Sequence, residues 1–194
     1  MKRNRNREPP SPSPLRPRWH VVLSALVAVL VGVVAGWLCW RGSNSPALPK
    51  ISNAQLDPTS ARVIEKYLDS VRHAPRSGAA WGELGGVLRL FEFREEAGRC
   101  FAIAERLNPK EVRWPYLHGL LLATDSPASA IACLRRAVAL CGNEPDTPRL
   151  RLARLLAEDG QGDKARRELE PLVQARPDHA PALLALAQLA EAAG

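Results

Sequence analysis

The feature that most limits the fold of this 194-residue chain is an internal repeat with a period of 34 residues. Small residues recur at this spacing at Gly85, Gly119 and Ala153, and leucines recur three positions after each of them. A period of this length is typical of solenoids, in which one supersecondary unit stacks on its neighbours to bury a continuous core. No segment is rich in strand-forming residues, so the sequence predicts an all-α stack of helix pairs.

The clearest unit spans residues 78–111. Its regularly placed residues are Trp81, Leu84, Gly85, Leu88, Ala97, Phe101, Ala104 and Pro109. This pattern resembles the tetratricopeptide repeat at every signature position, with Leu88 where the family usually has an aromatic residue. The resemblance implies two helices per unit that cross closely at Gly85 and Ala97, with Pro109 ending the second helix.

The same pattern continues in both directions and covers residues 58–194. It implies a right-handed α-solenoid of about three units, 78–111, 112–145 and 146–179, with half-units at 58–77 and 180–194. The first half-unit resembles a second helix with Val63, Tyr67 and Ser70 in phase. Two departures stand out, since the second unit closes on Cys141-Gly142 instead of proline and the third has Arg149 at an aromatic position. A generic helical bundle is the alternative.

An apolar segment of 20 uncharged residues, 21–40, precedes the repeats. As a helix it would be about 30 Å long, which matches the hydrocarbon core of a bilayer. Tryptophans stand at both ends, as interfacial anchors do. The sequence therefore predicts an uncleaved transmembrane signal-anchor, with a cleaved signal peptide as the alternative. The polar, proline-broken residues 41–57 are the predicted linker.

The charge distribution predicts the orientation of this anchor. Residues 1–20 hold six basic side chains against Glu8 alone, and with five prolines they are predicted to form a disordered cytoplasmic tail. The repeat array then lies on the periplasmic or extracytoplasmic side of the inner membrane. The rest of the chain has 21 basic and 19 acidic residues, so the net charge of +7 does not indicate a nucleic-acid-binding domain.

Small residues recur every four positions within the predicted span, at Ser24, Ala28, Gly32 and Gly36. Such a face lets two membrane helices approach closely, so a homodimer is one hypothesis. The alternative is that small residues are simply common in membrane helices. The last half-unit raises a related question, because residues 180–187 are almost entirely apolar. Either more helices follow in the natural protein or this helix docks on a partner or a second copy.

Tetratricopeptide arrays mostly bind peptides or proteins on the concave surface formed by the first helix of each unit. Carried over by position, this implies a groove that includes Gly82, Gly86, Arg89, Arg113, Tyr116, Leu120, Leu150, Arg151 and Arg154. The glycines replace the Lys and Asn of the carboxylate-clamp subfamily, so we expect an open stretch beside a set of arginines. Guanidinium groups pair with carboxylates, which favours an acidic or C-terminal peptide as ligand. Alternatively, these arginines form a solvated face paired with nearby acids.

Catalytic and cofactor motifs are absent from the sequence. It has no GxSxG, HExxH, P-loop or GxGxxG motif, and His73, His118 and His179 have no adjacent nucleophile motif. The four cysteines form no CxxC and no zinc- or haem-type spacing. Cys133 and Cys141 could approach each other only if the helix between them ended early; otherwise they are small buried residues. We therefore expect neither enzymatic activity nor a cofactor or metal.

Two functions follow as hypotheses. In the first, the chain is a membrane-tethered, non-enzymatic scaffold that binds a protein or peptide client on its concave face. In the second, it is the tethering or oligomerising part of a larger protein whose activity lies in a further C-terminal region.

Overall fold

The computed structural model describes residues 23, 26–27, 29–33, 46–51, 56–142 and 144–193. Its contacts divide the chain into two compact units, Met1–Ser45 and Pro46–Gly194. In the first unit, the described residues between 23 and 33 are helical and exposed. The rest of the predicted span 21–40 lies outside the described residues, as do Ser24, Ala28 and Gly36. Within the described part of the chain, no helix has the length and apolar character needed to cross a membrane.

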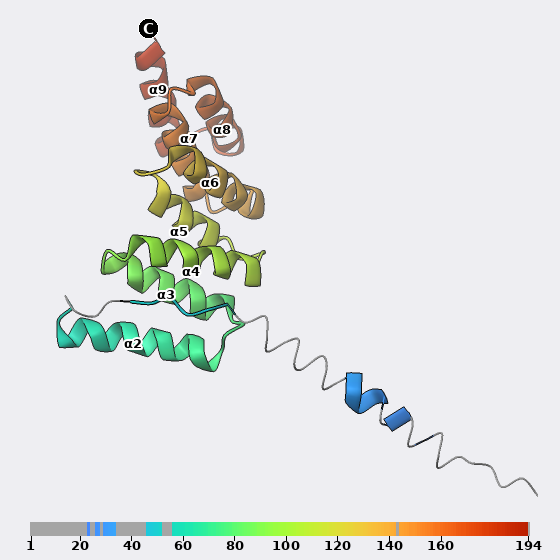
Figure 1. The fold of residues 1–194 in the computed structure, drawn as a ribbon. Helices are drawn as coiled ribbons and strands as arrows, with labels where there is room; N and C mark the ends of the chain where they lie inside the picture. The colour runs from blue at the N-terminus through green and yellow to red at the C-terminus, as the bar shows by residue number, and fades with distance from the viewer. Residues whose placement is uncertain are drawn as a thin grey trace, which may run out of the picture. The chain divides into compact units, whose positions relative to one another are not determined.

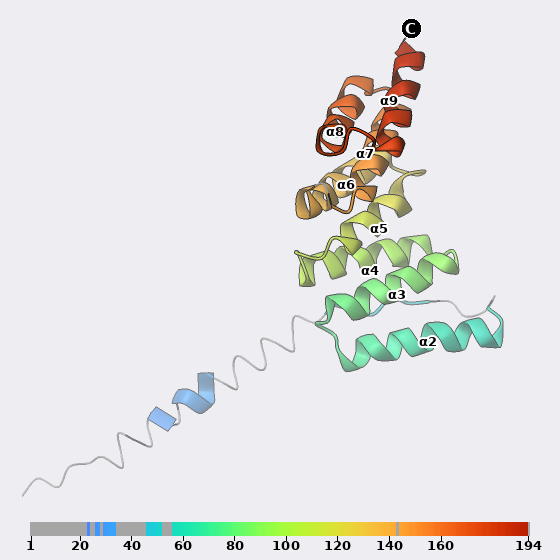
Figure 2. The same cartoon turned by 180° about the vertical axis from the view of Figure 1, so that it is seen from behind.

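The second unit is a stack of helices that follow one another in chain order (Figure 1 and Figure 2). The helices are α2 (Pro58–His73), α3 (Gly78–Leu90), α4 (Arg94–Leu107), α5 (Arg113–Leu122), α6 (Pro127–Cys141), α7 (Thr147–Glu158), α8 (Gly162–Ala175) and α9 (Ala180–Ala193). Contacts are most extensive within the pairs α3–α4, α5–α6 and α7–α8, and each pair also packs against the next. The described residues contain no β-strand. The predicted all-α helical repeat is thus confirmed.

The small residues of the repeat lie where the two helices of a pair cross. A Cβ atom on Gly85 of α3 would lie 3.0 Å from the Phe101 ring of α4. A Cβ atom on Gly119 of α5 would lie 2.9 Å from Leu134 Cγ of α6. A methyl group at either position would push the facing side chain away, so glycine allows the two helices of each pair to approach this closely.

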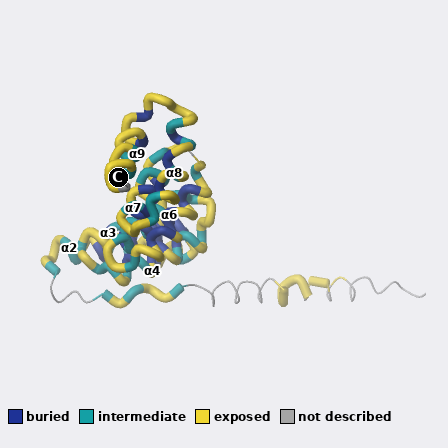
Figure 3. Tube along the Cα trace, turned by 90° about the horizontal axis from the view of Figure 1, so that it is seen from above, coloured by how far each residue is buried: buried dark blue, intermediate teal, exposed yellow. Residues whose placement is uncertain are grey.

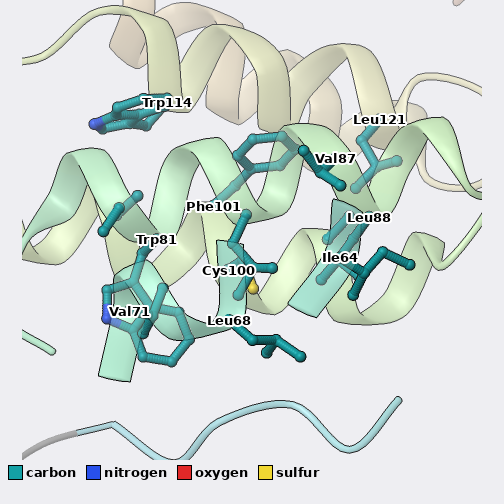
Figure 4. Close-up of a cluster of buried hydrophobic side chains, with 14 residues drawn as sticks. Ile64, Leu68, Val71, Trp81, Val87, Leu88, Cys100, Phe101, Trp114 and Leu121 are labelled. Atoms are coloured by element: carbon teal, nitrogen blue, oxygen red, sulfur yellow. The ribbon is translucent and has the colours of Figure 1, made fainter. Parts of the chain in front are cut away.

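Two clusters of buried side chains form the core, one over α2–α5 and one over α6–α9. Figure 4 shows the first, where Trp81 and Phe101 are fully buried. Buried residues follow the inner faces of the helices while the outer faces are exposed (Figure 3). Ile51 and Leu56, from the predicted linker, also pack against the first cluster. The part of the linker close to α2 therefore belongs to the folded unit.

Helix α2 has a capped first turn and buries one face. The Asp57 carboxylate accepts hydrogen bonds from the backbone N–H groups of Thr59 and Ser60, and Pro58 occupies the first turn. Ile64, Leu68 and Val71 are buried, whereas Val63 and Ser70, which are in phase with the second helices of the other units, are exposed. In the other units the corresponding face packs on a preceding first helix, and no described helix takes that place for α2.

Helix α6 shows where the second unit ends and whether Cys133 and Cys141 can approach each other. It runs without interruption to Cys141, and Gly142 ends it with a φ of +65°. Cys133 and Cys141 are eight residues apart on this continuous helix, a rise of about 12 Å. Both are free thiols, as Cys100 is.

Candidate peptide-binding groove

A cavity of about 830 Å³ lies between α7 and α9 and is also lined by residues of α8. Its apolar lining is Leu150, Ala153, Ala157, Leu169, Pro181, Ala185, Leu189 and Ala192. Most of these residues are small or short, because α7 and α9 carry alanines on the sides that face each other. The volume is within the range of about 300–1,000 Å³ that is usual for ligand sites. The cavity is therefore large enough for apolar side chains of a ligand.

One edge of the cavity is charged. Arg151, Arg154 and Glu158 of α7 line it, with Gln188 of α9 as a further polar group. Arg154 Nε donates to Glu158 Oε1 at 2.9 Å, and both side chains are more than half exposed. An exposed pair of this kind is worth less than about 1 kcal/mol, so a ligand carboxylate can compete for Arg154. Arg151 is exposed and has no ion-pair partner among the described side chains.

The two arginines also border a second cavity of about 180 Å³ on the other side of α7. There they meet Leu120 of α5, Ala123 just after that helix, and Leu134 of α6. Arg151 and Arg154 therefore form a ridge that borders both cavities. This arrangement places two cations beside both spaces where a bound chain could insert side chains.

The structure brings only some of the predicted groove residues together. Leu120, Leu150, Arg151 and Arg154 line these cavities, whereas Arg89, Arg113 and Tyr116 line neither. Arg113 instead pairs with Glu111 at 3.0 Å and lies over the Trp114 ring at 4.6 Å. Tyr116 is half-buried and packs against the second core cluster. Arg113 thus fits the second interpretation of the arginines, a solvated side chain paired with a nearby acid.

The expected open stretch at both glycines of α3 is wrong for Gly82. A Cβ atom there would overlap the six-membered ring of Trp114, which comes from α5 and is almost fully buried. Trp114 thus fills the space between α3 and α5, as its position in Figure 4 also shows. Gly86, one turn further on, has nothing within 4 Å of a Cβ atom and is open. The usable part of the groove is therefore displaced toward α7 and α9.

Helix α9, the far wall of the large cavity, is held at its first turn by His179. The Ala182 N–H donates to His179 Nδ1 at 3.1 Å, so the ring proton is on Nε2 and points to Asp146 Oδ2 at 2.7 Å. His179 is buried, with 4% of its side chain exposed. This hydrogen bond is the main cause that lowers the pKa of Asp146, and the nearby Arg176 adds to it. The two residues join the beginnings of α7 and α9.

Comparisons with known proteins agree with this architecture. The profile of the tetratricopeptide repeat family matches residues 146–189, which include α7, α8 and most of α9. Among curated proteins, no sequence matches the chain significantly. The solved structure of MamA is similar to this chain, with 20% sequence identity and a TM-score of 0.61; the match covers 70% of this chain and 79% of MamA. The structure of YrrB, titled a TPR protein with an unusual peptide-binding site, has 24% identity and a TM-score of 0.56, and the match covers 68% of each chain.

A third similar structure is a thermophilic TPR protein of Thermus thermophilus, at 22% identity and a TM-score of 0.53. It covers 68% of this chain, and the match spans 73% of that protein. At these identities the likenesses establish a shared helical-repeat fold and nothing about ligands.

Proposed function

We propose that this chain, a helical repeat of the tetratricopeptide type, is a non-enzymatic scaffold that binds a protein client through a peptide segment. The observation that carries the proposal is the cavity between α7 and α9, with its apolar floor and the Arg151–Arg154 ridge at its edge. Helical repeats of this type commonly present such surfaces to partners. One similar structure, YrrB, is titled as having a peptide-binding site, which supports the same class of ligand.

The chemistry of the groove defines the segment it would take. The floor is alanine, leucine and proline, so an apolar side chain gains free energy by leaving water there. The ridge offers two guanidinium groups, which bind carboxylates with paired hydrogen bonds. We therefore expect a segment in which one or two apolar side chains stand next to an acidic residue or a free C-terminus.

We further propose that residues 21–40 tether the array to the inner membrane, with the array on the extracytoplasmic side. The support is the uncharged run in the sequence and the basic residues before it. Within this span, the face of Ser24, Ala28, Gly32 and Gly36 is a surface on which two copies could pair. Tethering would confine the groove to clients close to the membrane surface.

The groove is tested with the full chain in detergent and a library of short peptides immobilised with free C-termini, alongside amidated copies. We expect peptides that combine apolar and acidic groups to bind. For the strongest, Arg151→Glu with Arg154→Glu should weaken binding about tenfold to a hundredfold, because charge-assisted hydrogen bonds are lost. Arg135→Glu is the matched control, since Arg135 is an exposed arginine of α6 that lines neither cavity. Equal binding by the double variant and the control would contradict the proposed site.

A further inference from the structure

Three residues with metal-binding side chains meet at the junction of the first two repeats. Glu105 comes from α4, His118 from α5 and Cys133 from α6, so none is near another in the sequence. Their ligand atoms all lie within 4.8 Å of one another. His118 Nδ1 and Glu105 Oε1 are 3.0 Å apart. The cluster thus offers one nitrogen, one sulfur and one oxygen to the same small space.

The cluster is well shielded from water. About 17% of the Glu105 side chain and 16% of the His118 side chain are exposed, and Cys133 is 4% exposed. A cavity of about 490 Å³ lies beside it, lined by Glu105 and Arg136 among others but by neither His118 nor Cys133. An ion that entered this cavity would meet the Glu105 carboxylate first and the two deeper groups after it.

Arg136 orients two of the three groups. Its guanidinium donates to Glu105 Oε2 at 2.8 Å and to Cys133 Sγ at 3.3 Å. The other carboxylate oxygen, Oε1, remains directed at His118. A side chain that hydrogen-bonds to two ligand groups holds their positions, as outer partners do in metal sites.

The other described cysteines, Cys100 and Cys141, do not lie beside a histidine and a carboxylate in this way. Burial, with Glu96 adding to it, raises the pKa of the Cys100 thiol to about 12, so Cys100 is a neutral part of the core. Cys141 Sγ contacts backbone carbonyl oxygens, those of Val138, Gly142 and Pro145. Among the described thiols, Cys133 is the one with a histidine and a carboxylate beside it.

We propose that Glu105, His118 and Cys133 bind one divalent ion of the borderline class, zinc before others, and that this ion joins the two repeats. Zinc accepts sulfur, nitrogen and oxygen ligands together, whereas magnesium and calcium require oxygen ligands. Around tetrahedral zinc, such ligand atoms lie about 3.3–3.6 Å from one another. Small side-chain movements would bring the three ligand atoms from their present separations, all within 4.8 Å, to these distances. A water molecule from the adjoining cavity would complete four-coordination. The ion would link α4 to both helices of the next pair.

The test uses metal-free full chain in detergent, titrated with Co²⁺ as a spectroscopic substitute for zinc. We expect one equivalent to bind with thiolate-to-cobalt charge-transfer absorption, and Zn²⁺ to displace it. Cys133→Ser should abolish this absorption, and His118→Gln should abolish tetrahedral binding. Arg136→Met, which leaves the ligands in place, should lower the affinity about tenfold to a hundredfold. Circular dichroism reports whether each variant is folded.

Cys141→Ser is the matched control, because it removes a thiol from the same helix outside the cluster. It should bind Co²⁺ like the unaltered chain, and Zn²⁺ should raise the unfolding temperature of both but not that of Cys133→Ser. The proposal is overturned if the folded chain shows no charge-transfer absorption with Co²⁺. It is equally overturned if folded Cys133→Ser retains that absorption, since the thiolate ligand would then be a different cysteine. None of these readings depends on peptide binding.

Discussion

At the scale of single residues, some glycines of this array allow a close approach of helices and others do not. Gly82 and Gly86 are one turn apart on α3, yet one is covered by Trp114 and the other is open. Gly82 therefore allows close packing between α3 and α5, the first helices of two neighbouring units. A Cβ atom at this position would disturb that packing. Gly86 has no such role in the described structure and only adds conformational freedom to the unfolded chain.

This contrast predicts opposite effects for the same substitution. Gly82→Ala should lower the free energy of unfolding by about 1–3 kcal/mol, because the Trp114 ring or the helix must shift. Gly86→Ala should raise it by about 0.5–1 kcal/mol, since alanine favours a helix over glycine and meets no neighbour. Urea denaturation followed by circular dichroism measures both. A loss of stability in Gly86→Ala as large as that in Gly82→Ala would show that packing is not the cause.

At the scale of elements, α9 is the least supported wall of the proposed groove. It packs on α8 and more weakly on α7, and Leu183 and Leu184 remain exposed on its outer side. Its first turn depends on His179, which connects the backbone of α9 to Asp146 at the beginning of α7. A change at this connection should therefore affect the groove as well as stability.

We expect His179→Ala to lower the free energy of unfolding by about 1–2 kcal/mol, because it removes a buried hydrogen bond and a helix cap. It should also weaken peptide binding, since α9 is a wall of the cavity. His73→Ala is the control, because His73 is exposed and, within the described part of the chain, its ring hydrogen-bonds to a carbonyl of its own helix. Equal stability of the two variants would contradict this role for His179.

The same connection predicts a pH dependence. The pKa of Asp146 is lower in the folded chain than its ordinary value, about 4, which applies when unfolded. Its contribution to stability is therefore complete above about pH 4 and is lost as the pH falls through the lower folded pKa. Asp146→Asn removes this titration, so its free energy of unfolding, measured against pH, should decrease less on acidification than that of the unaltered chain. Parallel pH profiles would rule out the contribution.

At the scale of the whole molecule, a repeat domain with a ridge of arginines is combined with a basic, apolar N-terminal region. If residues 21–40 span a bilayer, the groove is limited to partners near the membrane. The proposed tether is independent of the groove, because α2–α9 and their core clusters lie wholly within Pro46–Gly194. The two proposals can therefore fail separately.

For the tether, we expect the full chain to stay with membranes during alkaline carbonate extraction. Val29→Arg with Val31→Arg should release it, because each arginine at the centre of a span costs about 2.5–3.5 kcal/mol in insertion. Leu90→Arg with Leu140→Arg is the matched control, since both leucines are exposed on the repeat unit. Release of the unaltered chain by carbonate, or equal release of both variants, would contradict a membrane-spanning segment.

Local pattern was enough to predict the helical repeat. Residues 34 apart that are small or apolar imply stacked helix pairs, because each unit can bury its apolar faces only against its neighbours. The resemblance to the tetratricopeptide repeat implied the close crossing at Gly85, where Phe101 and Cys100 lie near the position of a Cβ atom. The family resemblance, carried over by position, placed Leu120, Leu150, Arg151 and Arg154 in a groove. Both arginines border both cavities, whereas Leu150 lines the larger one and Leu120 the smaller one.

Only the tertiary structure decided which of the predicted helix faces are covered by side chains from other helices. Trp114 covers Gly82, His179 holds α9 to Asp146, and Glu105, His118 and Cys133 meet from three helices. A repeat register assigns a residue to a helix face, but what covers that face depends on side chains from another unit, tens of residues away. The sequence by itself therefore determined the all-α repeat and the charge pattern. Contacts between units determined where the groove is open and where the candidate metal ligands converge.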